Sequence, residues 1–175
     1  VLTELVPKVL ALALQAKAAN MGFNIDAEEA DRLDISLDVI AAVLAAPELS
    51  GWHGFGVVVQ AFSKRAPWVL DWLYELARSL DRKIIVRLVK GAYWDAEIKR
   101  AQVIGLTDFP VFTRKANTDV SYLACAKKML AMNDLIYAQF ATHNAHSVAA
   151  ILQLAGDKHA YEFQRLHGMG ESLHA

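Results

Sequence analysis

Residues 83–95 read KIIVRLVKGAYWD, an aliphatic run that contains one arginine and ends at a glycine. An unbroken run of β-branched and aliphatic residues predicts a strand buried on both faces. Side chains alternate along a strand, so Arg87 shares one face with Ile85 and Val89. A guanidinium in such a strand needs a partner, because an unpaired buried charge is strongly destabilising. Gly91 permits a turn or the close approach of a ligand, so the stretch fits either a core arginine or a functional site.

Composition restricts the class of protein. The chain has 175 residues, enough for one hydrophobic core, and we expect residues 1–175 to form one domain. Its formal net charge of −1 at pH 7 gives no electrostatic footprint for nucleic acid. No apolar run reaches the roughly 18 residues of a membrane span, and the N-terminus lacks a signal-peptide pattern. The single cysteine, Cys125, is spaced as a core residue and fits a reducing compartment, so we expect a cytoplasmic protein.

Helical and strand patterns alternate along the chain. The predicted helices cover residues 2–20, 30–44, 67–80, 92–105, 119–132 and 145–155. The predicted strands cover residues 23–26, 56–62, 83–90, 135–141 and 161–166. Asp26 and Glu29 form a capping-box pattern for the second helix, and Asn144 is a candidate cap for the last. This alternation predicts a parallel α/β sheet.

Five parallel strands fit either an open doubly wound sheet or an arc of a (β/α)8 barrel. Polar residues recur on one face of otherwise apolar strands, which favours a common barrel lumen. These residues are Asn24, Asp26, Gln60, Arg87, Gln139, Glu162 and Gln164. Each strand also ends in a polar cluster, as in barrel enzymes, whose sites lie at the carboxyl ends of the strands. A complete barrel has eight strands in about 250 residues, so we expect this chain to supply about five of the eight.

Several segments together resemble one known family. They are NIDAEEADRL at 24–33, RLVKGAYWD at 87–95, TRK at 113–115, FATHNAH at 140–146 and LHGMGE at 166–171. All resemble the proline dehydrogenase domain of the bacterial bifunctional proline utilization A family, in the family's order. The resemblance implies an FAD-dependent (β/α)8 barrel that oxidises L-proline to Δ1-pyrroline-5-carboxylate by hydride transfer to flavin N5. It also implies that the electrons pass to a membrane quinone.

The resemblance assigns roles to individual residues. Arg87 would lie beside flavin N5, where a fixed cation stabilises the negative charge that develops there. Ala92, Tyr93 and Leu166 would border the proline ring, and Tyr93 would restrict its substituents. Asp26 would orient partners at the substrate end. The expected cofactor contacts are Gln60, Arg87, Val89, Gly91, Ala92, Trp94, Thr113, Arg114, Lys115, Thr142, His143, Asn144, Gln164 and Leu166.

Two of these assignments have plain structural alternatives. Arg114 and Lys115 would approach the phosphate or ribose of FAD, but a solvated surface pair explains them equally well without the family. Asp26 is also adequately explained as a helix cap.

Parts of the family's site have no counterpart in these 175 residues. In the family, an arginine pair in the last barrel helix and a lysine on the first strand hold the substrate carboxylate, and a glutamate contacts the adenine. We therefore expect the isolated chain to bind FAD weakly and to oxidise little proline. The aldehyde dehydrogenase half and peripheral membrane association are expected of the parent protein. Unpaired sheet edges predict self-association of the isolated chain.

Other functions fit the sequence less well. A metal-dependent hydrolase could use His143, His146, His167, Asp26 and Glu28, but their spacing is not diagnostic. A dinucleotide-binding sheet would need a Gly-x-Gly-x-x-Gly motif after a strand, which the glycines between residues 51 and 56 do not provide. A non-catalytic barrel segment with a role in assembly remains the third alternative.

Overall fold

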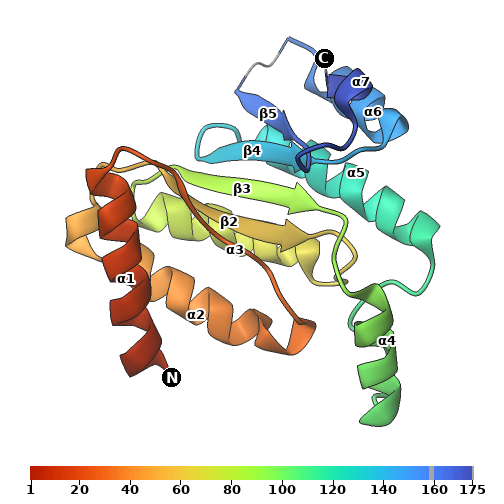
Figure 1. Ribbon diagram of the computed structural model, residues 1–175, viewed down its shortest axis with the longest axis horizontal. Coiled ribbons are helices and arrows are strands. Elements are labelled where there is room, and N and C mark those ends of the chain that lie inside the picture. The colour runs from red at the N-terminus through yellow and green to blue at the C-terminus, as the bar shows by residue number, and fades with distance from the viewer. Residues whose placement is uncertain (158–159, 175) are drawn as a thin grey trace.

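The computed structural model describes residues 1–157 and 160–174, which form one parallel sheet and the helices that pack on it (Figure 1). The strands are β1 (Phe23–Ile25), β2 (Phe55–Gln60), β3 (Ile84–Val89), β4 (Ile136–Ala141) and β5 (Tyr161–Gln164). They pair in the order β1-β2-β3-β4-β5, so each strand lies beside its neighbours in the sequence. A doubly wound sheet reverses its strand order at a switch point, whereas a barrel does not. The order is therefore that of a barrel arc.

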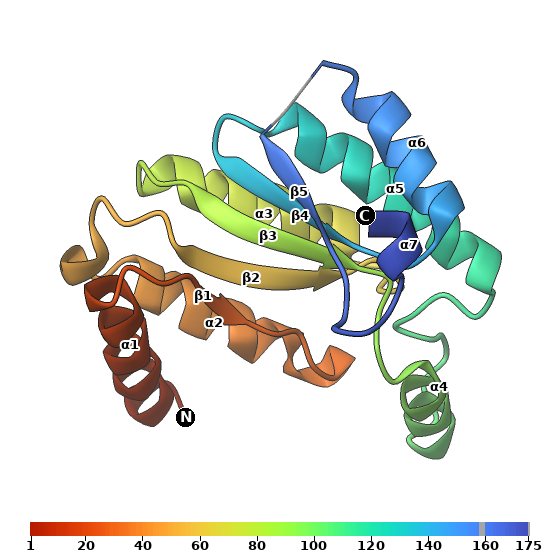
Figure 2. The same cartoon turned by 45° about the horizontal axis from the view of Figure 1, so that its top comes forward.

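Helices cover one side of the arc. The α-helices are α1 (Leu2–Ala18), α2 (Leu33–Leu44), α3 (Ala66–Ser79), α4 (Trp94–Val103), α5 (Lys115–Ala131), α6 (Ala145–Ala155) and α7 (Glu171–His174). Two short 3-10 turns are η1 (Ala30–Arg32) and η2 (Pro47–Leu49). In Figures 1 and 2, α3 and α5 lie behind the sheet, while α4 projects beyond the end to which the strand arrows point. None of the helices within the described ranges is both long and apolar enough to cross a membrane.

The hydrophobic core lies between the sheet and these helices. On β3, burial alternates strictly: Val86 and Leu88 are fully buried on the helix side, while Arg87 on the opposite face is only partly buried. The alternation predicted for β3 is therefore confirmed. The prediction that both faces are buried is wrong, because helices pack on only one face of the sheet in the part of the chain that the structure describes. Cys125 is buried among the core residues, as its spacing predicted.

Most predicted elements are present, and two local predictions are wrong. α5 begins at Lys115 instead of residue 119, because its polar first turn carries no apolar periodicity. Asp26 and Glu29 do not form a capping box: η1 intervenes, and α2 starts without a side-chain cap. Asn144 does cap α6, since its Oδ1 accepts a hydrogen bond from the Ser147 amide at 2.9 Å.

Candidate functional site

The polar face of the sheet carries its side chains in register. Arg87 on β3 lies level with Val58 on β2 and Gln139 on β4, and Gln139 lies level with Glu162 on β5. Residues level with one another in a parallel sheet present side chains to the same face. The recurrence of polar residues seen in the sequence is therefore one continuous row across β3, β4 and β5, with Arg87 at its β3 end.

Arg87 is held from two sides. Its Nη1 lies 3.0 Å from Oδ1 of Asp26, just beyond β1, and its Nε donates to Oε1 of Gln164, at the end of β5, at 2.6 Å. The Arg87 side chain is 27% exposed and that of Asp26 is 69% exposed. An ion pair this open to solvent contributes little stability. Its main effect is to fix the direction of the guanidinium across the polar face.

Gln60 connects two loops at the carboxyl ends of the strands. Its Nε2 donates to the Glu28 carbonyl at 2.8 Å, and its Oε1 accepts from the Ala92 amide at 2.9 Å. The side chain is buried, so both ends of the amide need these partners. Gln60 thereby holds the loop after β1 and the loop after β3 at a fixed separation.

The loop after β3 requires a glycine. Gly91 has φ +136°, and a Cβ there would lie 2.4 Å from the Phe62 ring. Tyr93 adopts a left-handed conformation with φ +64° and is 60% exposed, so its ring stands free at the start of α4. Trp94 donates from its indole nitrogen to the Phe112 carbonyl at 2.8 Å. This backbone presents Ala92 and Tyr93 at the open end of the sheet.

Two lysines share one carboxylate beside the site. Lys90 lies 2.5 Å from Oδ1 of Asp119, and Lys115 lies 2.7 Å from its Oδ2. Hydrogen bonds from Lys115 and then Lys90 hold the pKa of the Asp119 carboxyl below its usual value. Arg114, in contrast, is exposed and has no ion pair within residues 1–157 and 160–174. Arg114 is thus the cation of this group that remains free for an anionic ligand.

His143 organises the loop after β4. Its Nε2 accepts a hydrogen bond from the Leu166 amide at 3.0 Å, which places the proton of the neutral ring on Nδ1. His174 of α7 lies with its Nε2 3.0 Å from the Thr142 carbonyl oxygen. The segment after β5 is therefore joined to the end of β4 through two histidines.

These loops surround an open groove of about 1070 Å3 at the carboxyl ends of the strands. The groove is lined by all the predicted site residues except Trp94, Thr113 and Arg114. It is lined as well by Lys90 and Arg165, which the sequence did not single out as site residues. Cofactor sites typically occupy about 300–1,000 Å3. The volume of the groove and the fixed cation at Arg87 fit a flavin.

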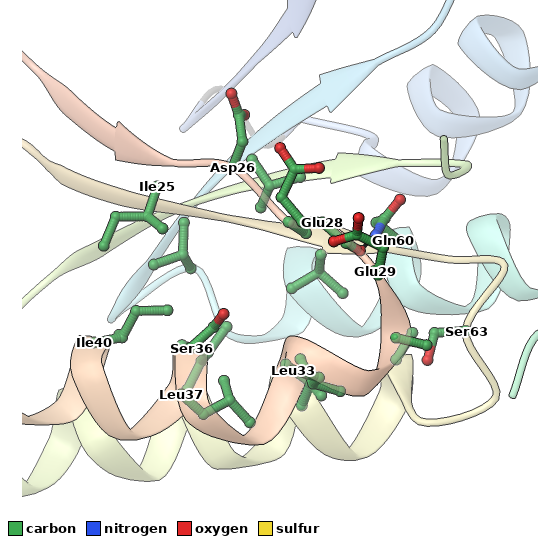
Figure 3. A pocket seen from close by; sticks show the side chains of 18 of the residues that line it. Ile25, Asp26, Glu28, Glu29, Leu33, Ser36, Leu37, Ile40, Gln60 and Ser63 are labelled. Atoms are coloured by element: carbon green, nitrogen blue, oxygen red, sulfur yellow. Dashed lines mark hydrogen bonds between the residues drawn. The ribbon is translucent and has the colours of Figure 1, made fainter. Parts of the chain in front are cut away.

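A second cavity lies on the other side of β1 and β2. Its volume is about 60 Å3, and it is lined mainly by apolar side chains of α2, α3 and the two strands. Figure 3 shows Leu33 and Leu37 of α2 there, while the carboxylate of Asp26 points away from them. This space is a packing void too small for a cofactor.

The metal-dependent hydrolase alternative requires ligand side chains that lie close together in the fold. Across the described ranges, no three His, Cys, Asp or Glu side chains come together as ligands for a metal ion. His143 already accepts the Leu166 amide, and His146 is exposed on α6.

The hydrogen bonds within the polar row were not predicted from the sequence. Glu162 was recognised only as a polar strand residue, yet it accepts hydrogen bonds from Gln139 and Gln164. The period-two recurrence of Glu162 and Gln164 on one face was the available signal. It could not reveal which side chain would be the shared acceptor.

Comparison with known proteins shows which family the chain resembles. The family model described as proline dehydrogenase matches residues 2–175. The chain is 59% identical over 177 residues to the bifunctional protein PutA of Escherichia coli K12, covering 99% of this chain and 13% of that protein. The same identity is found with PutA of Klebsiella aerogenes, of which the chain spans 14%.

Solved structures agree in fold. A crystal structure of a bifunctional proline utilization A (PutA) protein matches with TM-score 0.97 and 61% identity, covering 99% of this chain and 18% of that one. PutA from Bdellovibrio bacteriovorus inactivated by N-propargylglycine matches with TM-score 0.94 and 32% identity, covering 98% of this chain and 18% of that one. The predicted barrel-type α/β fold is therefore confirmed, with five parallel strands in this chain.

Proposed function

The chain belongs to the proline dehydrogenase family, and from that premise we propose that it forms the flavin- and proline-facing arc of an FAD-dependent proline dehydrogenase barrel. The observation that carries the proposal is the anchoring of Arg87, which Asp26 and Gln164 hold from two sides within the groove. A cation fixed in this way is suited to stabilise charge that develops on a bound cofactor.

The proposed reaction converts L-proline to Δ1-pyrroline-5-carboxylate. Proline loses a hydride from carbon and a proton from nitrogen, so its C–N single bond becomes a C=N double bond. FAD, when bound, would accept this hydride with its two electrons, and the proton would leave to solvent. The task of this chain is to hold proline and cofactor in a fixed relative orientation.

The groove supplies cofactor contacts of several kinds. Gly91 makes room for the Phe62 ring against the loop after β3, and Arg87 offers the guanidinium Nη2, for which no hydrogen bond is found among the described residues. Arg114 lies outside the lining of the groove and has no ion pair among the described residues, and it is proposed as the cation for the phosphate or ribose region. The other proposed contacts in the groove are Gln60, Val89, Ala92, Lys115, Thr142, His143, Asn144, Gln164 and Leu166. Trp94 and Thr113 are proposed as contacts beyond it.

The substrate end lies where the loops after β1, β3 and β5 converge. Ala92 and Leu166 are proposed to border the proline ring, and the exposed Tyr93 ring to limit its substituents. Asp26 orients Arg87 there through its ion pair. These residues provide no cation dedicated to the proline carboxylate, which fits the family's use of residues outside this stretch.

The wider partners are proposed from the family. The electrons pass to a quinone, which would require a cytoplasmic enzyme to associate peripherally with the membrane. An aldehyde dehydrogenase half in the parent protein would consume the product. β1 and β5 are the edge strands of the sheet, so the isolated chain is expected to self-associate.

The test uses the full-length protein that carries these residues. Incubation with L-proline and a soluble quinone should yield Δ1-pyrroline-5-carboxylate by mass spectrometry, with one quinone reduced for each imine formed. A protein that binds FAD but forms no imine would favour the non-catalytic alternative. The isolated 175-residue chain should form little imine.

A further inference from the structure

Glu162 lies at the centre of a hydrogen-bonded chain that ends at Arg87. It sits on β5 level with Gln139 of β4, which is level with Arg87 of β3. The Nε2 groups of Gln139 and Gln164 both donate to Oε1 of Glu162, at 2.8 and 2.7 Å. One carboxylate oxygen therefore receives the amide groups of two different strands.

This arrangement fixes the polarity of the Gln164 amide. A carboxylate only accepts hydrogen bonds, so Gln164 must turn its NH2 group toward Glu162. A guanidinium only donates, and Nε of Arg87 meets the opposite end of the same amide, Oε1, at 2.6 Å. Of the two orientations that a glutamine amide can take, only one satisfies both neighbours.

The orientation of the Gln139 amide is also set by the Glu162 carboxylate. Its Oε1 is buried and has no hydrogen-bond partner among the described residues. The reverse orientation would place this oxygen against Glu162, where two acceptors would repel each other. The other carboxylate oxygen, Oε2, lies 3.3 Å from the Tyr137 hydroxyl, which steadies Glu162 from a further side.

We infer that Glu162 is a positioning residue for Arg87: it fixes the amide of Gln164 so that the Gln164 oxygen holds the Arg87 guanidinium within the groove. The inference rests on the proposed function, because the orientation of Arg87 matters only if a cofactor lies beside it. Glu162 acts through Gln164 and has no hydrogen bond to Arg87 itself within the described residues.

The test substitutes Glu162→Gln in the full-length protein. A glutamine at this position can donate as well as accept, so the Gln164 amide is free to take either orientation. We expect kcat for proline to fall about tenfold, at the lower end of the effect of removing a partner that orients a functional group. KM for proline should be unchanged. The midpoint potential of the flavin should become more negative, because a loosened cation stabilises the reduced cofactor less.

Two further variants separate positioning from general damage. Gln164→Leu cuts the same chain on the side nearer Arg87, and should lower kcat at least as much as Glu162→Gln. The double variant should lose no more than the Gln164→Leu variant, because both residues act along one path. Glu75→Gln removes a carboxylate that pairs with Arg78 on the outer helix α3, and should leave kcat and the potential unchanged.

The outcomes distinguish this inference from the proposed function. If the wild-type protein forms no imine, the proposed function fails. If it oxidises proline and Glu162→Gln keeps the wild-type kcat and flavin potential, the positioning role is wrong. Additive losses in the double variant would also contradict it. Should Glu162→Gln fail to fold, Glu162→Asp decides, because its shorter side chain withdraws the carboxylate from the Gln164 amide. A lower kcat at constant KM with a more negative flavin potential supports the role, and unchanged values overturn it.

Discussion

Asp26 and Arg87 are 61 residues apart in the chain, yet their carboxylate and guanidinium meet at 3.0 Å across the polar face of the sheet. The contact joins the end of β1 to the middle of β3, with β2 between them. Such a long-range pair requires the sheet to be assembled first. The direction of the Arg87 side chain is therefore set by partners on other strands and not by β3 alone.

The first prediction concerns this ion pair. Asp26→Asn should lower proline turnover about tenfold in the full-length protein, since Arg87 loses one of its two anchors. Thermal stability should hardly change, because the pair is largely exposed. Asp34→Asn breaks a more exposed pair with Arg65 outside the groove and should change neither property. Equal turnover in the two variants, measured by quinone reduction, would contradict the role of Asp26.

The second prediction concerns the backbone at Gly91. Gly91→Ala should destabilise the protein by about 3 kcal/mol, because a strained φ and a collision with Phe62 add together. Gly105→Ala also introduces a side chain at positive φ, +67°, but into open space, and should cost only about 1 kcal/mol. Urea unfolding of both variants measures the difference. Similar midpoints would show that the Phe62 contact relaxes.

The third prediction separates the two basic residues before and at the start of α5. Arg114→Ala should weaken FAD binding about tenfold, since a charge-assisted contact to phosphate contributes at least 1.4 kcal/mol. Lys115→Ala should have a smaller effect, because Lys115 is already paired with Asp119. Titration of the apoprotein with FAD, followed by flavin fluorescence, measures both affinities. The reverse order would assign the phosphate to Lys115.

The fourth prediction is a pH dependence of stability. The pKa of Asp119 is lowered by Lys115 and Lys90, so its stabilising effect is fully present above the ordinary carboxyl pKa of about 3.9. That effect is lost as the pH falls through the lower pKa of the folded state. Asp119→Asn should therefore reduce the melting temperature more at about pH 7 than at about pH 3. Asp38→Asn, at an exposed position on α2, is the surface control for the substitution itself. A deficit independent of pH would rule out an electrostatic origin.

The strands and the polar face of the sheet could be predicted from the sequence, because both depend on the alternation of side chains along a single strand. The alternation around Arg87 placed it opposite Val86 and Leu88, and the structure agrees. The capping role predicted for Asp26 is wrong because η1 separates it from α2, and its carboxylate pairs with Arg87 of β3 instead. Neither the use of Gln60 as a bridge between loops nor the shared acceptor at Glu162 could be predicted, since both arise only when distant strands lie side by side.

Arg87 is proposed to be a fixed cation beside a flavin that proline reduces. The most direct test mixes L-proline anaerobically with the full-length protein and follows the visible flavin absorption band. The band should bleach rapidly in the wild-type protein and at least about a hundredfold more slowly in Arg87→Met, as is typical when a group that stabilises developing charge is removed. Bleaching of both proteins at the same rate would contradict the role of Arg87, and a wild-type band that proline does not bleach would contradict the proposed function.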